Sequence, residues 1–311
     1  MKTSWLRRAI RRALIVGSPA ALGSCTAFTS CPDNGHDPPI AEVVTLEGGL
    51  VGDEPLTASD CMSACSIVGG GEVVTCVRQS SDSALCIAHP APCEGRRPFG
   101  LQSLQTRPTD GLSCHLADAA WLEAASVDAF RLLRRELRAH GAPRRLLRAA
   151  SRSARDERRH ARSTRALARR FGVGVSKVER AASEPRSLFD VALENTIEGC
   201  VRETWGALVA MRQAERARDL GVRAAMMGIA RDELRHAELA WRIEHWLTPR
   251  LNGEQRRQLN EARRAALRQL NDELAHELEV SERERLGLPG AHEAHRMLAE
   301  LDRALGMSTR S

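Results

Sequence analysis

The stretch ARDERRHA at residues 154–161 recurs as ARDELRHA at residues 230–237, with seven of eight positions identical. Each copy places a Glu three residues before a His, and side chains at that spacing project from the same face of a helix. A carboxylate and an imidazole on one helix face can bind the same metal ion. The repeat therefore predicts a helical bundle in which two equivalent helices each supply a Glu-x-x-His pair to a metal site.

The chain around the repeat has the pattern of four long helices. Apolar residues recur at three- and four-residue spacing in segments rich in Ala, Leu, Arg and Glu, which glycine or proline interrupts. The connections are short, long and short, as in two helical hairpins joined by a crossover. We expect helices over about 115–140, 143–171, 188–218 and 222–248, in a four-helix-bundle domain at 114–250 that is followed by a C-terminal helical extension at 251–311.

The first and third helices each need a carboxylate at the height of the repeat. Glu123 and Glu198 lie 75 residues apart among apolar neighbours, close to the 76-residue offset of the repeat. The midpoint between Glu123 and Glu157 is residue 140, where the first turn is expected. The midpoint between Glu198 and Glu233 is 215.5, a few residues before the second turn, expected at 219–221. We assign this mismatch to the position of the turn and keep Glu198 as the ligand.

The bundle thus has six candidate metal ligands. Four carboxylates carry four negative charges, which two divalent ions cancel, so the buried charges balance as a set. Carboxylate together with imidazole favours iron or manganese over metals that prefer thiolate. Asp128 and Glu203 lie five residues beyond the ligand glutamates, off their face, and we expect both to be exposed. The six ligands are Glu123, Glu157, His160, Glu198, Glu233 and His236.

Each ligating imidazole needs an acceptor for its second ring nitrogen. Asp156 and Asp232 are the candidates, each accepting from the His of the opposite hairpin. Arg159 and Arg235 are expected to pair with these aspartates. Glu194, one helical turn before the third-helix ligand, has two interpretations: an additional ligand or a solvated helix residue. The competing interpretation of the whole pattern is a surface of ion pairs without metal, which the apolar neighbours of the paired glutamates disfavour.

The paired Asp-Glu-x-Arg-His sequences at 156–160 and 232–236 resemble the ferritin-like superfamily of di-iron carboxylate proteins, which includes rubrerythrins, bacterioferritins and soluble di-iron oxygenases. The resemblance covers residues 115–250. It implies two Fe ions, with Mn as an alternative. It also implies that Glu157 and Glu233 bridge the ions, whereas Glu123 and Glu198 are terminal ligands.

A reduced metal pair of this kind binds dioxygen or peroxide, so we expect an oxidoreductase that acts on one of these small oxidants. Its electron donor is unknown, because the chain has no rubredoxin-type pair of Cys-x-x-Cys motifs. The absence of tyrosine excludes a tyrosyl radical. The alternative function is a non-enzymatic metal-binding or structural lipoprotein that uses the bundle as a scaffold.

Residues 1–24 have the pattern of an export signal. A basic stretch that ends at Arg12 precedes an apolar run at 14–22, which is too short to span a bilayer as a helix. The sequence LGSC at 22–25 resembles the lipobox of bacterial lipoproteins, which implies cleavage before Cys25 and a lipid on its thiol. An ordinary signal peptide with a nearby Cys is the alternative. We expect a protein that is exported to the bacterial cell envelope and contacts the membrane only through this lipid.

Residues 25–113 are rich in Gly, Pro, Ser and Asp, and seven of the nine cysteines lie between Cys31 and Cys114. In an exported chain, this pattern predicts a small disulfide-stapled module of loops and short strands. A zinc site at Cys61-x-x-x-Cys65 and Cys86 to Cys93 is the competing interpretation. Cys200 either pairs with this module or is an inert core residue. The strand-like runs are 41–46, 72–77 and 84–88.

The formal charge of +6 comes from 46 basic and 40 acidic residues. Residues 1–24 hold five of the basic residues and no acid, so the remainder has 41 basic and 40 acidic residues. A nearly neutral protein gives no reason to expect a nucleic-acid partner. Because the arginines are interleaved with acids at helical spacing, we expect an ion-paired surface.

Overall fold

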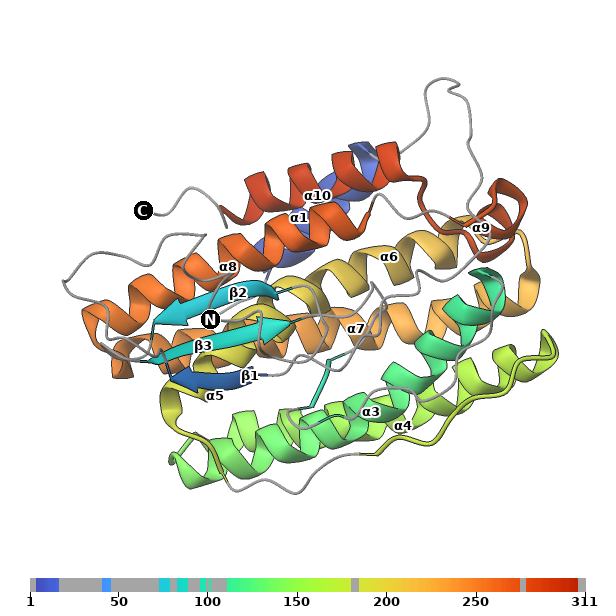
Figure 1. Ribbon diagram of the computed structural model, residues 1–311. Coiled ribbons are helices and arrows are strands. Elements are labelled where there is room, and N and C mark those ends of the chain that lie inside the picture. The colour runs from blue at the N-terminus through green and yellow to red at the C-terminus, as the bar shows by residue number, and fades with distance from the viewer. Residues whose placement is uncertain are drawn as a thin grey trace.

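The structure is a computed structural model that describes residues 4–16, 41–45, 73–78, 83–88, 96–98, 101, 111–179, 185–274 and 278–306. It is mainly helical, with a small sheet on one side (Figure 1). Helices α3 (Gly111–Ala139) and α4 (Arg144–Arg170) form one hairpin. The other hairpin consists of α5 (Leu188–Glu194), the π-helix η1 (Asn195–Arg202) and α6 (Glu203–Arg216), followed by α7 (Leu220–Leu247).

The four predicted helices are confirmed to within a few residues, as are the short, long and short connections. Gly141 closes the first turn with a φ of 72°, a conformation that glycine adopts without strain. Asp219 caps α7 by accepting hydrogen bonds from the backbone N–H groups of Gly221 and Val222. Helices α4 and α7, which carry the sequence repeat, pack against each other and join the hairpins.

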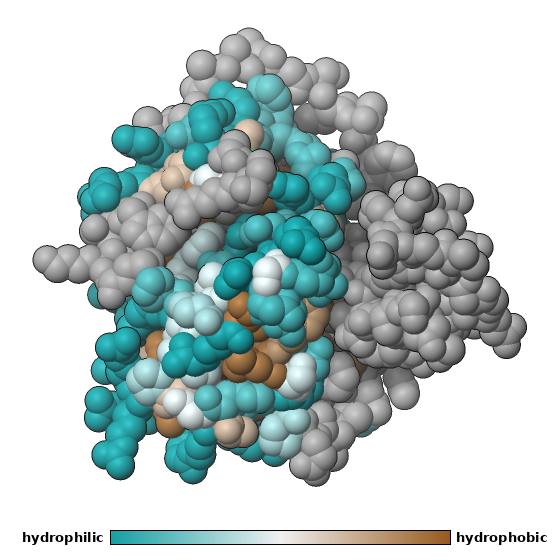
Figure 2. All heavy atoms as spheres, turned by 90° about the vertical axis from the view of Figure 1, so that its left-hand side faces the viewer, coloured by the Kyte–Doolittle hydropathy of each residue, from teal (hydrophilic) through white to brown (hydrophobic). Residues whose placement is uncertain are grey.

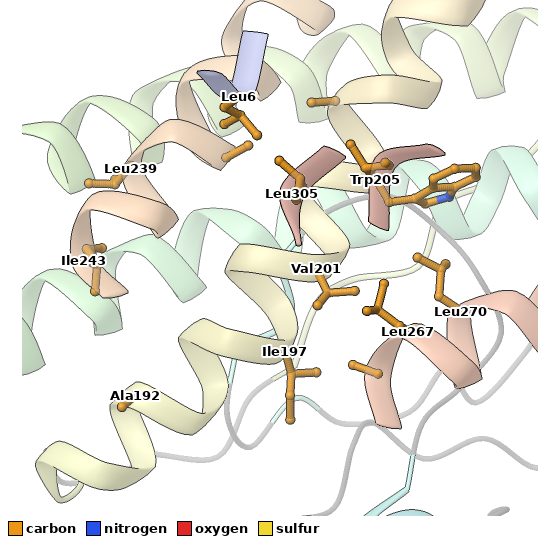
Figure 3. Packing of buried hydrophobic residues seen from close by; sticks show 14 of the residues in the cluster. Leu6, Ala192, Ile197, Val201, Trp205, Leu239, Ile243, Leu267, Leu270 and Leu305 are labelled. Carbon is orange, nitrogen blue, oxygen red and sulfur yellow. The ribbon is translucent and has the colours of Figure 1, made fainter. Parts of the chain in front are cut away.

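The C-terminal segment is helical, as expected, and continues the same core. It contains the short η2 (Thr248–Arg250), α8 (Gly253–Glu273), α9 (Val280–Leu286) and α10 (Ala291–Leu305). Figure 3 shows Leu267 and Leu270 of α8 beside Val201 of η1. A single hydrophobic cluster extends through α3, η1, α7, α8 and α10. The extension and the bundle therefore share one core.

Helix α1 (Ser4–Val16) overlaps the expected export signal. It lies along α10 (Figure 1), and Leu6, Ala9 and Ile10 are at most 3% exposed. The guanidinium of Arg7 donates to the Glu238 carboxylate over 2.7 Å. Cys25, the expected site of the lipid, lies outside the described residues, so cleavage and lipidation stay predictions. Within the described residues, every helix is too short or too polar to cross a bilayer.

The three expected strands are confirmed as β1 (Ala41–Thr45), β2 (Val73–Arg78) and β3 (Ser83–Ala88). They form an antiparallel sheet in the order β1-β3-β2. Cys114 is disulfide-bonded, whereas Cys200 is a free thiol in the core, which confirms the second of its two interpretations. The other cysteines of the expected framework lie outside the described residues or in strands whose side chains are not described. Their pairing stays a prediction.

Candidate metal centre

Six acidic and imidazole side chains from four helices meet in the middle of the bundle. Helix α4 supplies Glu157 and His160, and α7 supplies the equivalent Glu233 and His236. Helix α3 supplies Glu123, and α6 supplies a carboxylate from its first residue, Glu203. All six are between 1% and 6% exposed, so none is solvated as a surface charge would be.

The first group surrounds His160. Its Nδ1 lies 3.1 Å from Glu233 Oε1, 3.4 Å from Glu123 Oε2 and 3.5 Å from Glu157 Oε2. One donor atom from each of these four residues lies within 4.8 Å of the others, which is close enough to hold one metal ion.

The second group surrounds His236. Its Nδ1 lies 2.8 Å from Glu157 Oε1, 3.4 Å from Glu233 Oε1 and 3.8 Å from Glu203 Oε2. Donor atoms of Glu157, Glu203 and His236 also lie within 4.8 Å of one another. Glu157 and Glu233 contact both imidazoles, whose ring centroids are 5.8 Å apart. The two groups are therefore adjacent and share carboxylates.

Several donor atoms of this cluster lack ordinary partners. Within the described part of the chain, both carboxylate oxygens of Glu157, both of Glu203, and Nδ1 of each imidazole are buried without a hydrogen bond. Buried polar atoms are normally satisfied, and each exception needs an explanation. These unsatisfied atoms converge on common points, and cations at those points would satisfy them together. The donor set of buried glutamates and histidines could hold metal.

Glu203 occupies the place in the cluster where Glu198 was expected. We expected Glu198 in the cluster and Glu203 at the surface, but Glu203 is 2% exposed and faces His236, whereas Glu198 belongs to neither group. The reason lies in the hairpin lengths: 34 residues separate Glu123 from Glu157, but only 30 separate Glu203 from Glu233. Because the two hairpins differ in length, the 76-residue offset of the repeat does not lead from Glu123 to the equivalent carboxylate of the second hairpin.

The midpoint between Glu203 and Glu233 is residue 218, which lies between the end of α6 and the start of α7. Antiparallel neighbours at one height must be equidistant from their turn. The turn therefore lies close to its expected position, and Glu203 rather than Glu198 lies at the height of the cluster. Asp128 is half-exposed and pairs with Arg131, as a surface acid does.

Glu198 instead neutralises buried arginines. Its Oε2 accepts a hydrogen bond from the Arg97 backbone N–H over 3.2 Å, and its Oε1 lies 3.6 Å from the Arg97 guanidinium and 3.9 Å from that of Arg202. Glu194 likewise belongs to neither donor group, and its side chain is only 13% exposed. It accepts from Arg96 over 2.9 Å and also pairs with Arg186.

The aspartates and arginines around the imidazoles lie as predicted from the repeat. His160 Nε2 lies 3.2 Å from Asp232 Oδ2, and His236 Nε2 lies 3.6 Å from Asp156 Oδ2, so each His faces the aspartate of the other hairpin. Arg159 donates to both aspartates over 2.7 Å. Arg235 contacts Asp156 over 3.1 Å and also pairs with Asp232.

Burial and mutual contacts shift the pKa values of the groups in the cluster in opposite directions. Burial, followed by the charge of a neighbouring glutamate, raises the pKa of both Glu123 and Glu203 well above the ordinary value. Burial would also raise the pKa of Glu233, but the charge of His236 and contacts with both imidazoles lower it to about 2. Burial would lower the pKa of each imidazole, but the surrounding carboxylates raise it.

The aspartates outside the cluster remain ionised. Burial would raise the pKa of Asp156, but contacts with His236 and with two arginines lower it below its ordinary value. Burial would likewise raise the pKa of Asp232, and the charge of Arg235 and the contact with His160 lower it. Each imidazole thus faces a permanently charged acceptor on the side away from the cluster, which fixes its orientation.

A small cavity reaches the cluster from the end of the bundle near the α6–α7 turn. Its volume is about 30 Å³, and its lining is mostly apolar, with Leu116, Leu167 and Met226 among the side chains. Glu123 of the cluster is one of its lining residues. A space of this size holds one or two water-sized molecules and excludes a larger organic compound.

Comparison with known proteins adds no family to this description. No protein-family model, no curated protein and no solved structure matches the chain. The assignment of a function therefore depends on the site itself.

Proposed function

We propose that this chain is a ferritin-like protein that binds two metal ions, preferentially iron, and acts as an oxidoreductase on dioxygen or peroxide. The observation that carries the proposal is the pair of adjacent buried donor groups that share Glu157 and Glu233. Their mixture of carboxylate and imidazole donors favours iron or manganese. The four-helix arrangement with Glu-x-x-His on two helices is the one that carries di-iron sites in this fold.

The chain's own residues would hold the ions in two similar environments. Glu123 and His160 would bind one ion, and Glu203 and His236 the other, with Glu157 and Glu233 between them. When bound, such a pair of ions supplies two-electron redox chemistry toward an oxygen–oxygen bond.

The surrounding residues orient and protect this site. Asp156 and Asp232 hold the imidazoles in one orientation. Phe130 packs against His236, with ring centroids 5.0 Å apart, and excludes water from that side. The small, mostly apolar cavity that Glu123 helps to line suits a small uncharged oxidant. Glu123 and Glu203, whose pKa values burial raises, could also exchange protons with a bound oxidant.

Metal analysis tests the site directly. Protein loaded anaerobically with Fe(II) and freed of excess metal should contain about two ions per chain, as expected for two adjacent donor groups. Glu157→Ala removes a shared carboxylate and should lose most of this metal. A wild-type chain without metal and with equal thermal stability before and after loading would overturn the proposal.

Activity requires a separate measurement. Oxygen consumption or peroxide loss by the iron-loaded protein, abolished in Glu157→Ala, would support the oxidoreductase. Metal binding without either reaction would favour the non-enzymatic metal-binding lipoprotein.

We also propose that the protein is anchored to the cell envelope through a lipid on Cys25. The supporting feature is the LGSC sequence at 22–25 after a basic and apolar leader. Cys25→Ser should move the protein from the membrane fraction to the soluble fraction of a bacterial host. Unchanged partitioning would count against the anchor.

A further inference from the structure

A cavity of about 870 Å³ lies between α3, α4 and α7, beside the first hairpin turn. Nine of its sixteen lining residues are arginines, against two acids. Figure 2 looks onto the end of the molecule that carries this turn, where hydrophilic residues surround a small hydrophobic area. This concentration of one charge contradicts the expected interleaving of arginines with acids.

The arginines come from three helices but converge on one space. Arg144, Arg148 and Arg152 follow each other at four-residue spacing on α4, so they form a stripe along one face. Arg138 of α3 and Arg242 of α7 line the same cavity. Like charges at this spacing repel one another and destabilise a helix. A stripe that costs stability indicates a function that needs it.

The two acids of the cavity neutralise only part of this charge, since Asp156 pairs with the lining Arg235. Asp156 already contacts Arg159 and Arg235, and Glu238 pairs with Arg7. Among the residues that the structure describes, no carboxylate forms an ion pair with seven of the lining arginines. These are Arg134, Arg138, Arg144, Arg145, Arg148, Arg152 and Arg155.

Some other surface arginines of the protein have acidic partners. Arg170 pairs with Asp219, and Arg218 pairs with Glu284 over 2.8 Å. Within the cavity, burial lowers the pKa of Arg242, the charge of Glu238 offsets part of this effect, and the charge of Arg145 lowers the pKa further. The two guanidinium groups therefore repel each other. The cavity has an unbalanced positive charge that a bound anion would neutralise.

The start of α4 adds to this field. Pro143 precedes the helix without a side-chain cap, and Arg144 and Arg145 form its first turn. The first backbone N–H groups of a helix and its dipole both attract anions. Guanidinium groups bind phosphate oxygens through two parallel hydrogen bonds, which makes arginine the preferred residue for this chemistry.

We infer that this cavity between α3, α4 and α7 is a binding site for a ligand that carries two or more phosphate groups. Its volume is that of a site for a small molecule, and side chains of three helices line it, so it suits a compact ligand better than an extended polymer. The inference does not depend on a metal in the cluster. Asp156 and Arg235 line the cavity and also lie beside the imidazoles of the cluster.

Calorimetric titration of the full-length protein with inorganic tripolyphosphate tests the inference. We expect saturable binding at about one ligand per chain, which weakens as salt concentration rises. The double substitution Arg145→Ala with Arg148→Ala should weaken binding at least tenfold. The matched control, Arg264→Ala with Arg268→Ala, removes the same charge from α8, outside the cavity, and should leave binding unchanged.

Absence of saturable binding to wild type, or equal loss in the two double variants, would overturn the inference. Circular dichroism and the melting temperature of both variants show whether a loss reflects unfolding. Vesicles containing cardiolipin, whose headgroup carries two phosphates, distinguish the source of the phosphate groups, with phosphatidylcholine vesicles as the reference. Binding to the anionic vesicles that only the Arg145/Arg148 variant loses assigns the site to a lipid headgroup, and binding to tripolyphosphate alone assigns it to a free phosphate compound.

Discussion

Two glutamates five residues apart have opposite roles in this protein. Glu203 is buried beside His236 with both oxygens unsatisfied, whereas Glu198 is buried beside the cations of Arg97 and Arg202. A carboxylate that faces cations of the protein is neutralised, and one that faces only imidazole and other carboxylates needs a metal or a proton. The surroundings of each side chain, rather than its residue type, determine the role.

The pair provides a matched test of the metal site. Glu203→Gln should lower the iron content by about one ion per chain, because the second donor group loses its terminal carboxylate. Glu198→Gln should retain both ions and instead lower the melting temperature, since it leaves buried arginines without a charged partner. Metal analysis and thermal unfolding of both variants give the answer. Loss of iron in Glu198→Gln alone would show that the assignment of Glu203 is wrong.

Metal binding should depend steeply on pH. Burial raises the pKa of Glu123 and Glu203, and the surrounding carboxylates raise the pKa of the two imidazoles. Divalent ions that bind to these groups would therefore displace protons from them. Affinity should therefore rise with pH. Titrations in buffers of different ionisation enthalpy measure the protons released, and a value near zero would contradict this account.

At the scale of elements, the π-helix η1 lies immediately before Glu203, in the middle of the third long helix. Such segments are frequent at functional sites, because the extra residue in the turn changes which side chains face inward. Its centre contains Gly199, which packs against α7 and against Arg96. A Cβ at this position would lie 2.7 Å from Ala240 Cβ and 3.0 Å from Arg96 Nη1. The glycine allows η1 and α7 to approach closely.

Two glycine substitutions should have opposite effects. Gly199→Ala should lower the free energy of unfolding by about 1–3 kcal/mol, because the added methyl overpacks the contact with α7. Gly228→Ala, on the exposed face of α7, has no heavy atom within 4 Å of its new Cβ and should raise it by about 0.5–1 kcal/mol. Urea denaturation measures both. Equal effects of the two changes would argue against close packing at Gly199.

At the scale of the whole molecule, the bundle and the helices after it are held together by one core and by buried ion pairs. Arg202 of η1 donates to both oxygens of Glu273 at the end of α8, over 2.7 and 3.0 Å. Both side chains are at most 10% exposed. A pair in this position specifies how α8 lies on the bundle, whereas the apolar contacts of Leu267 and Leu270 supply most of the hydrophobic stabilisation.

Removing one member of this pair should destabilise the protein more than removing both. Glu273→Ala leaves the Arg202 guanidinium buried without its main partner, which should cost about 3–5 kcal/mol. The double change Arg202→Met with Glu273→Leu replaces the charges by apolar groups and should recover most of that loss. The double variant should also keep its metal content, since neither residue contacts the cluster. Urea denaturation of the single and double variants checks the energies, and additive losses would contradict the prediction.

The sequence by itself determined the four long helices, the three strands and the two Glu-x-x-His pairs. These features depend on periodicity and on spacing within one element, and both can be read from neighbouring residues. Pairing of His160 and His236 with the aspartates of the opposite hairpin also followed, because the repeat makes the two halves equivalent. The structure alone decided that Glu203 rather than Glu198 faces the cluster, and that arginines of α3, α4 and α7 line one cavity. Both outcomes depend on the relative height and rotation of packed helices, which turn lengths and the π-helix set and which no single segment of sequence contains.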